Sequence, residues 1–397
     1  IIYDEVGPDV DPLSPENILV FATGPLTGTD APASGRFCIV SKSPLAHPKD
    51  HPEHGAIFDA HSGGEWGPEL KFAGFDAIIL RGKAASPKYL WIHEGVAELR
   101  DASAHWGKNT VETTADIRAE TDLRAKVACI GPAGENLVRT AAVINDANTP
   151  GFGRACGRDG GGAVMGSKNL KAIAVRGTKK IEIANPGAFA DVVRETRDEA
   201  IPTGPVTGVG LPTYGTAVLV NIINGAGMYP TCNFKWGMFK EAHDTSGETI
   251  AATILTRTKG CYNCNMRCGR VTATTGVFAG EGEGPEYETT WSLGAQCGVH
   301  DLAAIAKAHY LTNELGLDTI SAGNTVGCAM ELCKEGHLDL PGYAAGENPF
   351  GDGALLVDLI EKTASREGVG DDLAEGSKRL ATKYGAPELS MSVKGLE

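Results

Sequence analysis

The sequence lacks any apolar run of the roughly 18 residues that a membrane-spanning helix requires, so we expect no membrane span. It also lacks an excess of basic residues, because 36 lysines and arginines face 50 acidic residues and the formal charge is −14. Since nucleic-acid phosphates are bound by basic surfaces, this charge argues against a nucleic-acid partner. No signal peptide, internal repeat or low-complexity tract is visible. These absences leave a globular, cytoplasmic protein as the expectation.

The hydrophobic pattern indicates two domains. The chain has 397 residues, and a hydrophobic fraction of 42% is enough for two cores. Before Asn185, short apolar runs between glycines predict β-strands, with one clear helix at Thr110–Glu120 that Asn109 would cap. From Asn185 onward the period is helical, and Gly or Pro occupies most gaps. We therefore predict an α+β fold, with a β-rich N-terminal platform over residues 1–184 and an all-helical domain over residues 185–397.

Cysteine spacing is the most informative local pattern. Of ten cysteines, Cys261, Cys264 and Cys268 form a Cys-x2-Cys-x3-Cys run, which in a chain of this length favours metal binding in a reducing compartment over disulfides. Three thiolates on one loop suit a soft metal and predict an iron–sulfur cluster, whose fourth ligand often comes from a distant segment. Zinc would need another nearby pair of Cys or His, and Cys297 is too far along the chain for that. Zinc and free thiols are the alternatives.

A glycine-rich stretch at residues 160–171 resembles a cradle for phosphate groups, because basic residues flank backbone that a ligand can approach closely. These basic residues are Arg154, Arg158, Lys168 and Lys171. The stretch is not a P-loop, since Ser167 precedes the lysine. A tight turn with solvated basic residues is the alternative. Three histidines, His47, His51 and His54, form either a metal site or part of a solvated loop.

Beyond single motifs, segments along almost the whole chain occur in the order of one known family. They include Asp-Pro-Leu-Ser-Pro-Glu-Asn at residues 11–17, Gly-Pro-Ala-Gly-Glu-Asn at 131–136, the cysteine run, Glu283–Glu288, and Gly-Leu-Asp-Thr-Ile-Ser at 316–321. Together these segments resemble the tungsten-dependent aldehyde ferredoxin oxidoreductase family. Compared with the family, the chain begins inside the usual start and lacks the third domain, so we expect it to be a fragment of a longer protein.

The resemblance implies a tungsten or molybdenum centre held by two pterins in residues 1–184, and a [4Fe–4S] cluster on Cys261, Cys264 and Cys268 in residues 185–397. It also implies a Mg²⁺ ion bridging the pterin phosphates. Arg36 and Arg154 would hold phosphates, and the backbone of Ala155 and His61 would ligate Mg²⁺. The cofactor-binding residues implied are Arg36, His61, Gly63, Arg154, Ala155, Gly157, Asn313, Leu317 and Asp318. His61 and Asn313 stand where the family often has Asn and Asp.

The function that the resemblance implies is oxidation of a small aldehyde to a carboxylate. Glu286 would handle a proton beside the metal, and electrons would pass through the cluster to a ferredoxin-like acceptor. The resemblance also allows a homodimer. Two alternatives remain: reduction of an aromatic thioester, as in related tungsten enzymes, and an inactive truncated metal-binding fragment. The sequence leaves the aldehyde, the choice of metal and the fourth cluster ligand unassigned.

Overall fold

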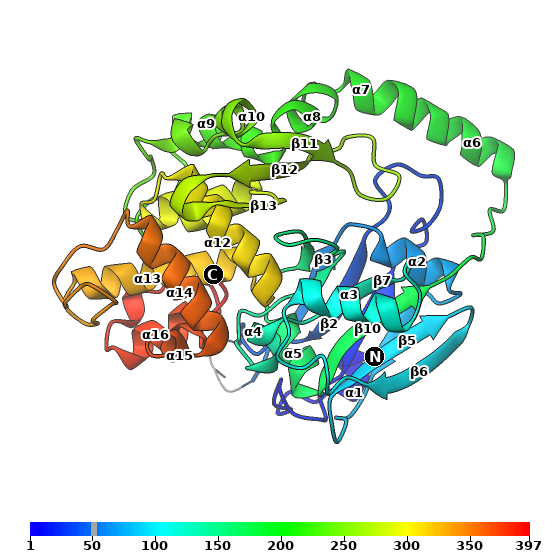
Figure 1. Ribbon diagram of the computed structural model, residues 1–397, viewed down its shortest axis with the longest axis horizontal. Helices are drawn as coiled ribbons and strands as arrows, with labels where there is room; N and C mark the ends of the chain where they lie inside the picture. Colours follow the sequence, from blue (N-terminus) through cyan, green and yellow to red (C-terminus); the bar gives the residue numbers. More distant parts are fainter. Residues whose placement is uncertain (49–53) are drawn as a thin grey trace.

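The computed structural model describes residues 1–48 and 54–397. A β-rich part and a mainly helical part lie side by side, with the N-terminus in the β-rich part and Glu397 close to the helices of the other (Figure 1). Residues 177–185 contain no helix or strand and lead from the last strand of the β-rich part to the first helix of the second part. The domain boundary at residue 184 stays a prediction.

The β-rich part contains two sheets. The first has the order β3-β2-β1-β4 and is antiparallel throughout. Its strands are β1 (Leu19–Thr23), β2 (Phe37–Lys42), β3 (Ile57–Ser62) and β4 (Ala77–Leu80). The second has the order β6-β5-β10-β7-β8-β9, with one parallel pair between β5 and β10. Its strands are β5 (Lys88–His93), β6 (Val96–Asp101), β7 (Lys126–Cys129), β8 (Val143–Asn145), β9 (Arg154–Cys156) and β10 (Leu170–Arg176).

An aromatic core joins these two sheets. Trp66, on α2 (Trp66–Phe72), is fully buried and its ring lies 4.5 Å from that of Phe37 and 5.6 Å from that of Phe21. Its indole Nε1 donates to the carbonyl of Ile173 on β10 at 3.0 Å, so it touches both sheets. The other helices of this part are α1 (Ile2–Glu5), α3 (Thr110–Glu120), α4 (Pro132–Glu135) and α5 (Gly161–Ser167). This packing holds the ends of β2, β3 and β9 in one place.

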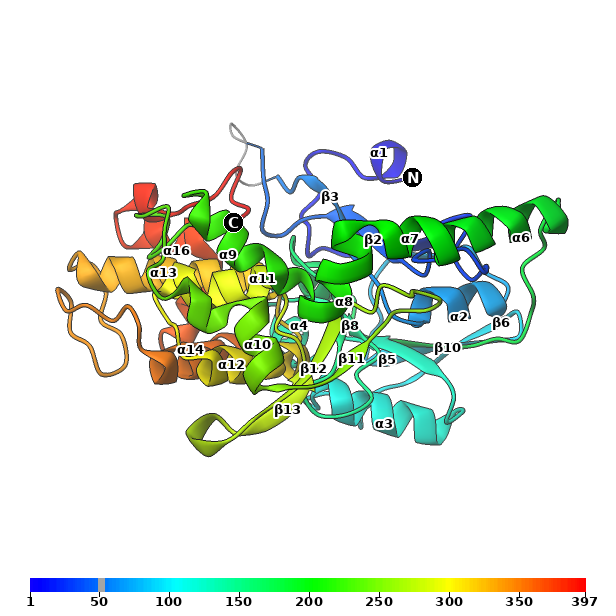
Figure 2. The same ribbon diagram turned by 90° about the horizontal axis from the view of Figure 1, so that it is seen from above.

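The second part is built around a core of helices that bury Leu, Ile and Ala side chains between them. These helices are α12 (Leu302–Leu315), α13 (Thr319–Lys334), α14 (Gly353–Ser365), α15 (Gly370–Leu373) and α16 (Ser377–Lys383). Other helices precede them: α6 (Pro186–Glu195), α7 (Ile201–Thr203), α8 (Leu211–Tyr214), α9 (Leu219–Gly225), α10 (Gly247–Thr253) and α11 (Tyr287–Thr289). Figure 2 shows α6 and α7 reaching over the β-rich part.

The α+β class is confirmed, but the prediction of an all-helical second domain is wrong. A third sheet, antiparallel with the order β11-β12-β13, lies between helices α8–α10 and helix α12 (Figure 1). Its strands are β11 (Leu255–Lys259), β12 (Gly269–Thr274) and β13 (Gly280–Glu283). Threonine recurs at every second position in β11 (Thr256 and Thr258) and in β12 (Thr272 and Thr274), a pattern that favours strands. The cysteine run lies in the loop between these two strands.

In the described ranges, no single helix is long and apolar enough to cross a bilayer. One bent pair, Pro205–Tyr214 and Thr216–Gly225, meets the requirement by length and composition, with an angle of 106° between its halves.

Candidate active site

A cavity of about 450 Å³ lies where the ends of β2, β3 and β9 face β13, α12 and α13. Most of the predicted site residues line it: Arg36, His61, Gly63, Arg154, Ala155, Cys268, Glu286, Asn313, Leu317 and Asp318. A larger hollow of about 820 Å³ beside α6 contains none of them. The structure therefore brings together residues that are up to 282 positions apart in the sequence, counted from Arg36 to Asp318.

The three predicted residues that do not line the cavity lie next to its wall. A Cβ on Gly63 would be 2.7 Å from Sγ of Cys261, so the cysteine loop packs against the end of β3. A Cβ on Gly157 would likewise be 2.7 Å from Oδ1 of Asp318. Cys264 belongs to the same short loop, which is also tied down where the Tyr262 amide donates to the carbonyl of Gly64 at 3.1 Å. Only glycine leaves room for these approaches.

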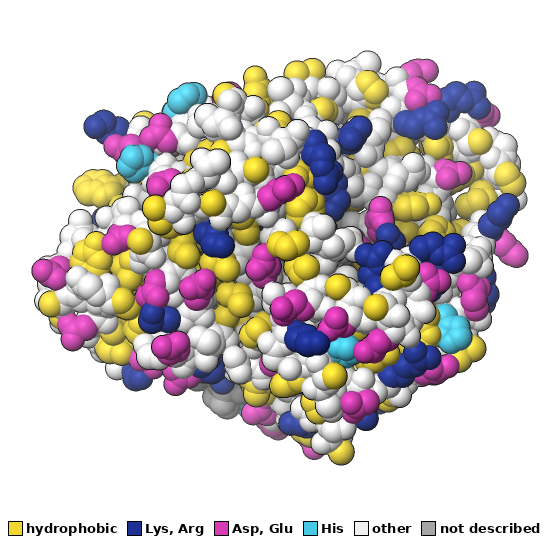
Figure 3. Space-filling model, viewed as in Figure 1, with side chains coloured by type: hydrophobic (Ala, Val, Ile, Leu, Met, Phe, Trp, Pro, Cys, Tyr) yellow, Lys and Arg dark blue, Asp and Glu magenta, His cyan; other side chains and the backbone are white. Residues whose placement is uncertain are grey.

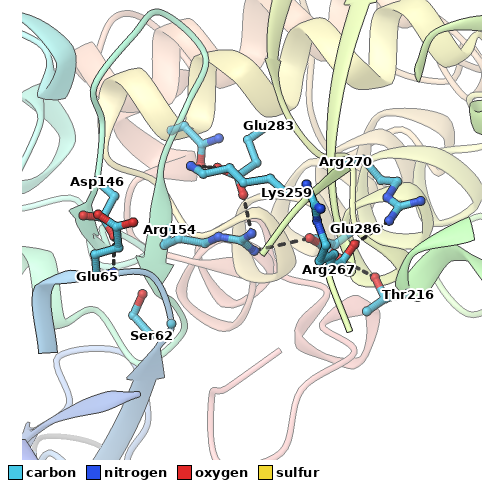
Figure 4. Close-up of polar contacts among 12 residues, drawn as sticks. Ser62, Glu65, Asp146, Arg154, Thr216, Lys259, Arg267, Arg270, Glu283 and Glu286 are labelled. Atoms are coloured by element: carbon cyan, nitrogen blue, oxygen red, sulfur yellow. Dashed lines mark hydrogen bonds and ion pairs between the residues drawn. The ribbon is translucent and has the colours of Figure 1, made fainter. Parts of the chain in front are cut away.

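Arg154 is the central cation of the site. It pairs with Glu283, and its Nη1 lies 3.5 Å from Oε1 of Glu286 (Figure 4). Burial opposes the charge on Arg154, but the carboxylate of Glu283 raises its pKa, so the guanidinium stays charged. The other oxygen of Glu286 accepts a hydrogen bond from Thr216 Oγ1 at 2.5 Å. Arg36, by contrast, is exposed and forms no ion pair with a carboxylate within the described residues.

His309 on α12 was not identified from the sequence, although it lies four residues before Asn313 and so on the same helix face. Burial lowers the pKa of His309 to about 4, which keeps the ring neutral. Its Nε2 donates to the carbonyl of Glu283 at 2.7 Å. Asn313 donates through Nδ2 to the carbonyl of Gly151 at 3.0 Å, which leaves its oxygen as an acceptor. Both side chains line the cavity.

Asp318 is held by its own helix. It caps the N-terminus of α13, where one carboxylate oxygen accepts from the Ser321 amide at 2.8 Å. Burial raises its pKa. Leu317 beside it is buried and forms a β-bridge with Ala141, so this turn is fixed to the β-rich part.

The glycine-rich stretch does not place its lysines at the cavity. Lys168 donates to the carbonyls of Asn17 and Gly82, the second at 3.2 Å, and Lys171 pairs with Glu135 in the interior. Both lysines are buried, so they neither hold a ligand in the cavity nor lie solvated in a turn. The expectation of a cradle that includes them is therefore wrong. Arg154 and Gly157, just before this stretch, remain beside the cavity.

The cysteines and histidines are the residues that the sequence offered as metal ligands. Burial, with a smaller contribution from the neighbouring Glu286, raises the pKa of the Cys268 thiol to about 11. Within the described residues, no three His, Cys, Asp or Glu side chains converge closely enough to hold a single metal ion. His54 lies 3.1 Å from Asp9 and His61 lies 2.7 Å from Asp59, while His51 falls outside the described residues.

These residues fit the cofactors that the sequence resemblance implies. Two guanidinium groups beside closely approachable glycine backbone suit phosphates. Acceptors on α12 and at the start of α13 suit the N–H groups of a ring edge. Three thiols on one loop against the end of β3 suit an iron–sulfur cluster.

Comparison with known proteins identifies the family. Residues 1–177 match the family model for the N-terminal domain of aldehyde ferredoxin oxidoreductase, and residues 191–397 match the model for its domains 2 and 3. The chain belongs to the aldehyde ferredoxin oxidoreductase family, which confirms the resemblance seen in the sequence.

The similar proteins include tungsten-containing enzymes. The tungsten-containing aldehyde ferredoxin oxidoreductase of Pyrococcus furiosus is 53% identical over 100% of this chain, and that of Pyrococcus abyssi is 51% identical. The chain spans 63% of the length of each. Among solved structures, the BamBC active-site complex of benzoyl coenzyme A reductase matches with a TM-score of 0.81 and 31% identity, over 100% of this chain and 60% of that one.

Proposed function

We propose that the protein oxidises a small aldehyde to the carboxylate, releasing two electrons and three protons per aldehyde and water consumed. The observation that carries this proposal is the position of Glu286, whose carboxylate lies at the cavity wall with Cys268 and Arg154. The identity of 53% with a tungsten-containing aldehyde ferredoxin oxidoreductase supports the same reaction. We further propose a cytoplasmic location and, as the resemblance allows, a homodimer.

We assign each proposed cofactor to residues that line or adjoin the cavity. Arg36 and Arg154 would hold the phosphates of a bis-pterin centre with tungsten or molybdenum, and the carbonyls of Ala155 and His61 would hold Mg²⁺. The thiols of Cys261, Cys264 and Cys268 would hold a [4Fe–4S] cluster. Gly63 and Gly157 would give the backbone its close approach, and Asn313, Leu317 and Asp318 would line a pterin edge. When bound, these groups would accept the two electrons and pass them on singly.

The protein's own part in the reaction is to move a proton. Glu286 accepts a hydrogen bond from Thr216 Oγ1 and lies 3.5 Å from Arg154, two contacts that orient its carboxylate at the cavity wall. A carboxylate in this position can take a proton from water or from the aldehyde carbon as it is oxidised. Burial lowers the pKa of His309 to about 4 and its Nε2 donates to a backbone carbonyl, so it is a weak base and does not compete with Glu286 for the proton.

Positive charge near the cysteine loop supports a negatively charged electron acceptor such as a ferredoxin. No acidic residue occurs between Glu248 and Glu281, a stretch that includes the loop and the basic residues Arg257, Lys259, Arg267 and Arg270. Arg257 and Arg267 are exposed. Figure 3 shows acidic and basic side chains mixed over most of this face, with lysines and arginines near the hollow between β11 and the β-rich part. Opposite charges speed the encounter of electron-transfer partners.

Replacing Glu286 tests the assignment. Glu286→Gln in the complete enzyme keeps the hydrogen-bond acceptor for Thr216 but removes the base, so kcat should fall by about 100-fold or more. Metal, iron and pterin contents should stay at the wild-type level. Glu281→Gln, at an exposed position on β13 five residues earlier, is the matched control and should retain activity. Near-normal turnover in Glu286→Gln would contradict the assignment of Glu286 as the base.

A second candidate function is reduction of an aromatic thioester. The likeness to the benzoyl coenzyme A reductase complex, with a TM-score of 0.81, favours it. Its identity of 31% is well below the 53% shared with the aldehyde-oxidising relative, so we place it second.

A further inference from the structure

Glu283 is a buried carboxylate whose two oxygens each meet a cation. It ends β13 and is only 2% exposed. Oε1 pairs with Arg154 on β9, and Oε2 lies 2.7 Å from Nζ of Lys259 on β11 (Figure 4). Because a buried charge without a partner is costly, the two cations account for its burial. Glu283 on β13 therefore links β9 of the β-rich part to β11 of the third sheet.

This pair of contacts lies at the base of the cysteine loop. Lys259 and Gly269 face each other in the β11–β12 register, so they are the two ends from which the loop emerges. A Cβ on Gly269 would lie 2.5 Å from Nη2 of Arg154 and 3.1 Å from Oε1 of Glu283. The ion pair therefore packs against the residue that follows Cys268.

Arg154 also faces Glu286 at 3.5 Å, which gives it two carboxylates and a position beside the loop thiols. We propose that Glu283 is a positioning residue: it holds Arg154 and Lys259 in fixed places beside the cysteine loop, and its charge balances theirs. Through this balance it sets the potential of the cluster and leaves Glu286 free to handle a proton. The inference rests on the proposed function, because it concerns the cluster assigned there.

The test is an EPR-monitored redox titration of the cluster in the complete enzyme, purified without oxygen. Glu283→Gln keeps the shape of the side chain but leaves the charges of Arg154 and Lys259 uncompensated. Uncompensated positive charge favours the reduced, more negative cluster. The ratio of reduced to oxidised cluster at a fixed potential should therefore rise about tenfold, which corresponds to about 59 mV for a one-electron couple. Exposed Glu281, two residues earlier, provides the control: Glu281→Gln should leave the ratio unchanged.

A second variant decides the case if Glu283→Gln does not accumulate. Lys259→Met removes one cation and leaves Glu283 with Arg154, so the ratio of reduced to oxidised cluster should fall instead of rise. A wild-type ratio in every variant that is recovered with full iron content would overturn the proposal.

The same preparations separate this inference from the proposed function. If wild-type enzyme carries the cluster but oxidises no aldehyde, the proposed function fails, and the role of Glu283 is still decided by the potential. A wild-type preparation without an iron–sulfur signal would overturn both.

Discussion

At the scale of single residues, burial of the Asp159 carboxylate makes the stability of the folded protein depend on pH. Asp159 lies in a left-handed turn before α5, and burial raises its pKa from 3.8 to about 6, while Arg158 opposes the shift. The folded protein therefore holds a proton that the unfolded chain has released in this range. This contribution to stability is fully present below pH 3.8 and is lost as the pH rises through about 6.

Asp159→Asn should remove this dependence, because Asn carries no titrating proton. The free energy of unfolding of the variant, relative to wild type, should become more favourable by about 1–2 kcal/mol between pH 4 and pH 7, after allowance for partial solvent screening. Urea unfolding at a series of pH values measures this difference. Parallel stability curves for the two proteins across that range would refute it.

The sequence predicted which residues belong to the site better than it predicted where their side chains point. The spacing of the cysteines and the family motifs identified Cys268, Glu286 and Asn313, and the structure brings these to one cavity. The prediction that Lys168 and Lys171 bind phosphates was wrong. A charged residue next to glycines is usually exposed, but here each lysine is buried and bonded to groups in the interior. His309 was missed since a lone histidine on a helix carries no motif.

At the scale of elements, local signals worked where one residue decides the boundary. Asn109 was predicted to cap α3, and the structure confirms it with a complete capping box. Asn109 Oδ1 accepts from the Glu112 amide at 2.9 Å, and the Glu112 side chain accepts from the Asn109 amide at 3.1 Å. The third sheet was overlooked because the period of the surrounding helices dominated and its strands are short.

The capping box formed by Asn109 and Glu112 should contribute measurably to the free energy of unfolding. Asn109→Ala should lower the free energy of unfolding by about 1 kcal/mol, since one amide at the start of α3 loses its acceptor. Glu112→Gln is the matched control, because glutamine can still complete the box. Thermal or urea unfolding of both variants checks this. Equal losses for the two, or none for Asn109→Ala, would contradict the role of the cap.

At the scale of the whole molecule, the site depends on contacts between distant parts of the chain. Strand ends in the β-rich part meet β13, α12 and α13 of the second part, and α6 and α7 reach over the first part (Figures 1 and 2). Hydrophobic periodicity cannot predict such contacts, because it reports only which face of an element is buried. The order of motifs along the chain supplied that information through the family resemblance.

The most direct test of the account is an anaerobic assay of the complete enzyme with short aldehydes and a viologen dye, alongside analysis of tungsten, molybdenum and iron. The account predicts aldehyde-dependent dye reduction by protein that contains both iron and one of the two heavier metals. An aromatic thioester with a reduced dye serves as the competing substrate and should remain unchanged. Enzyme with its full metal content that oxidises no aldehyde, or that reduces the thioester instead, would contradict the account.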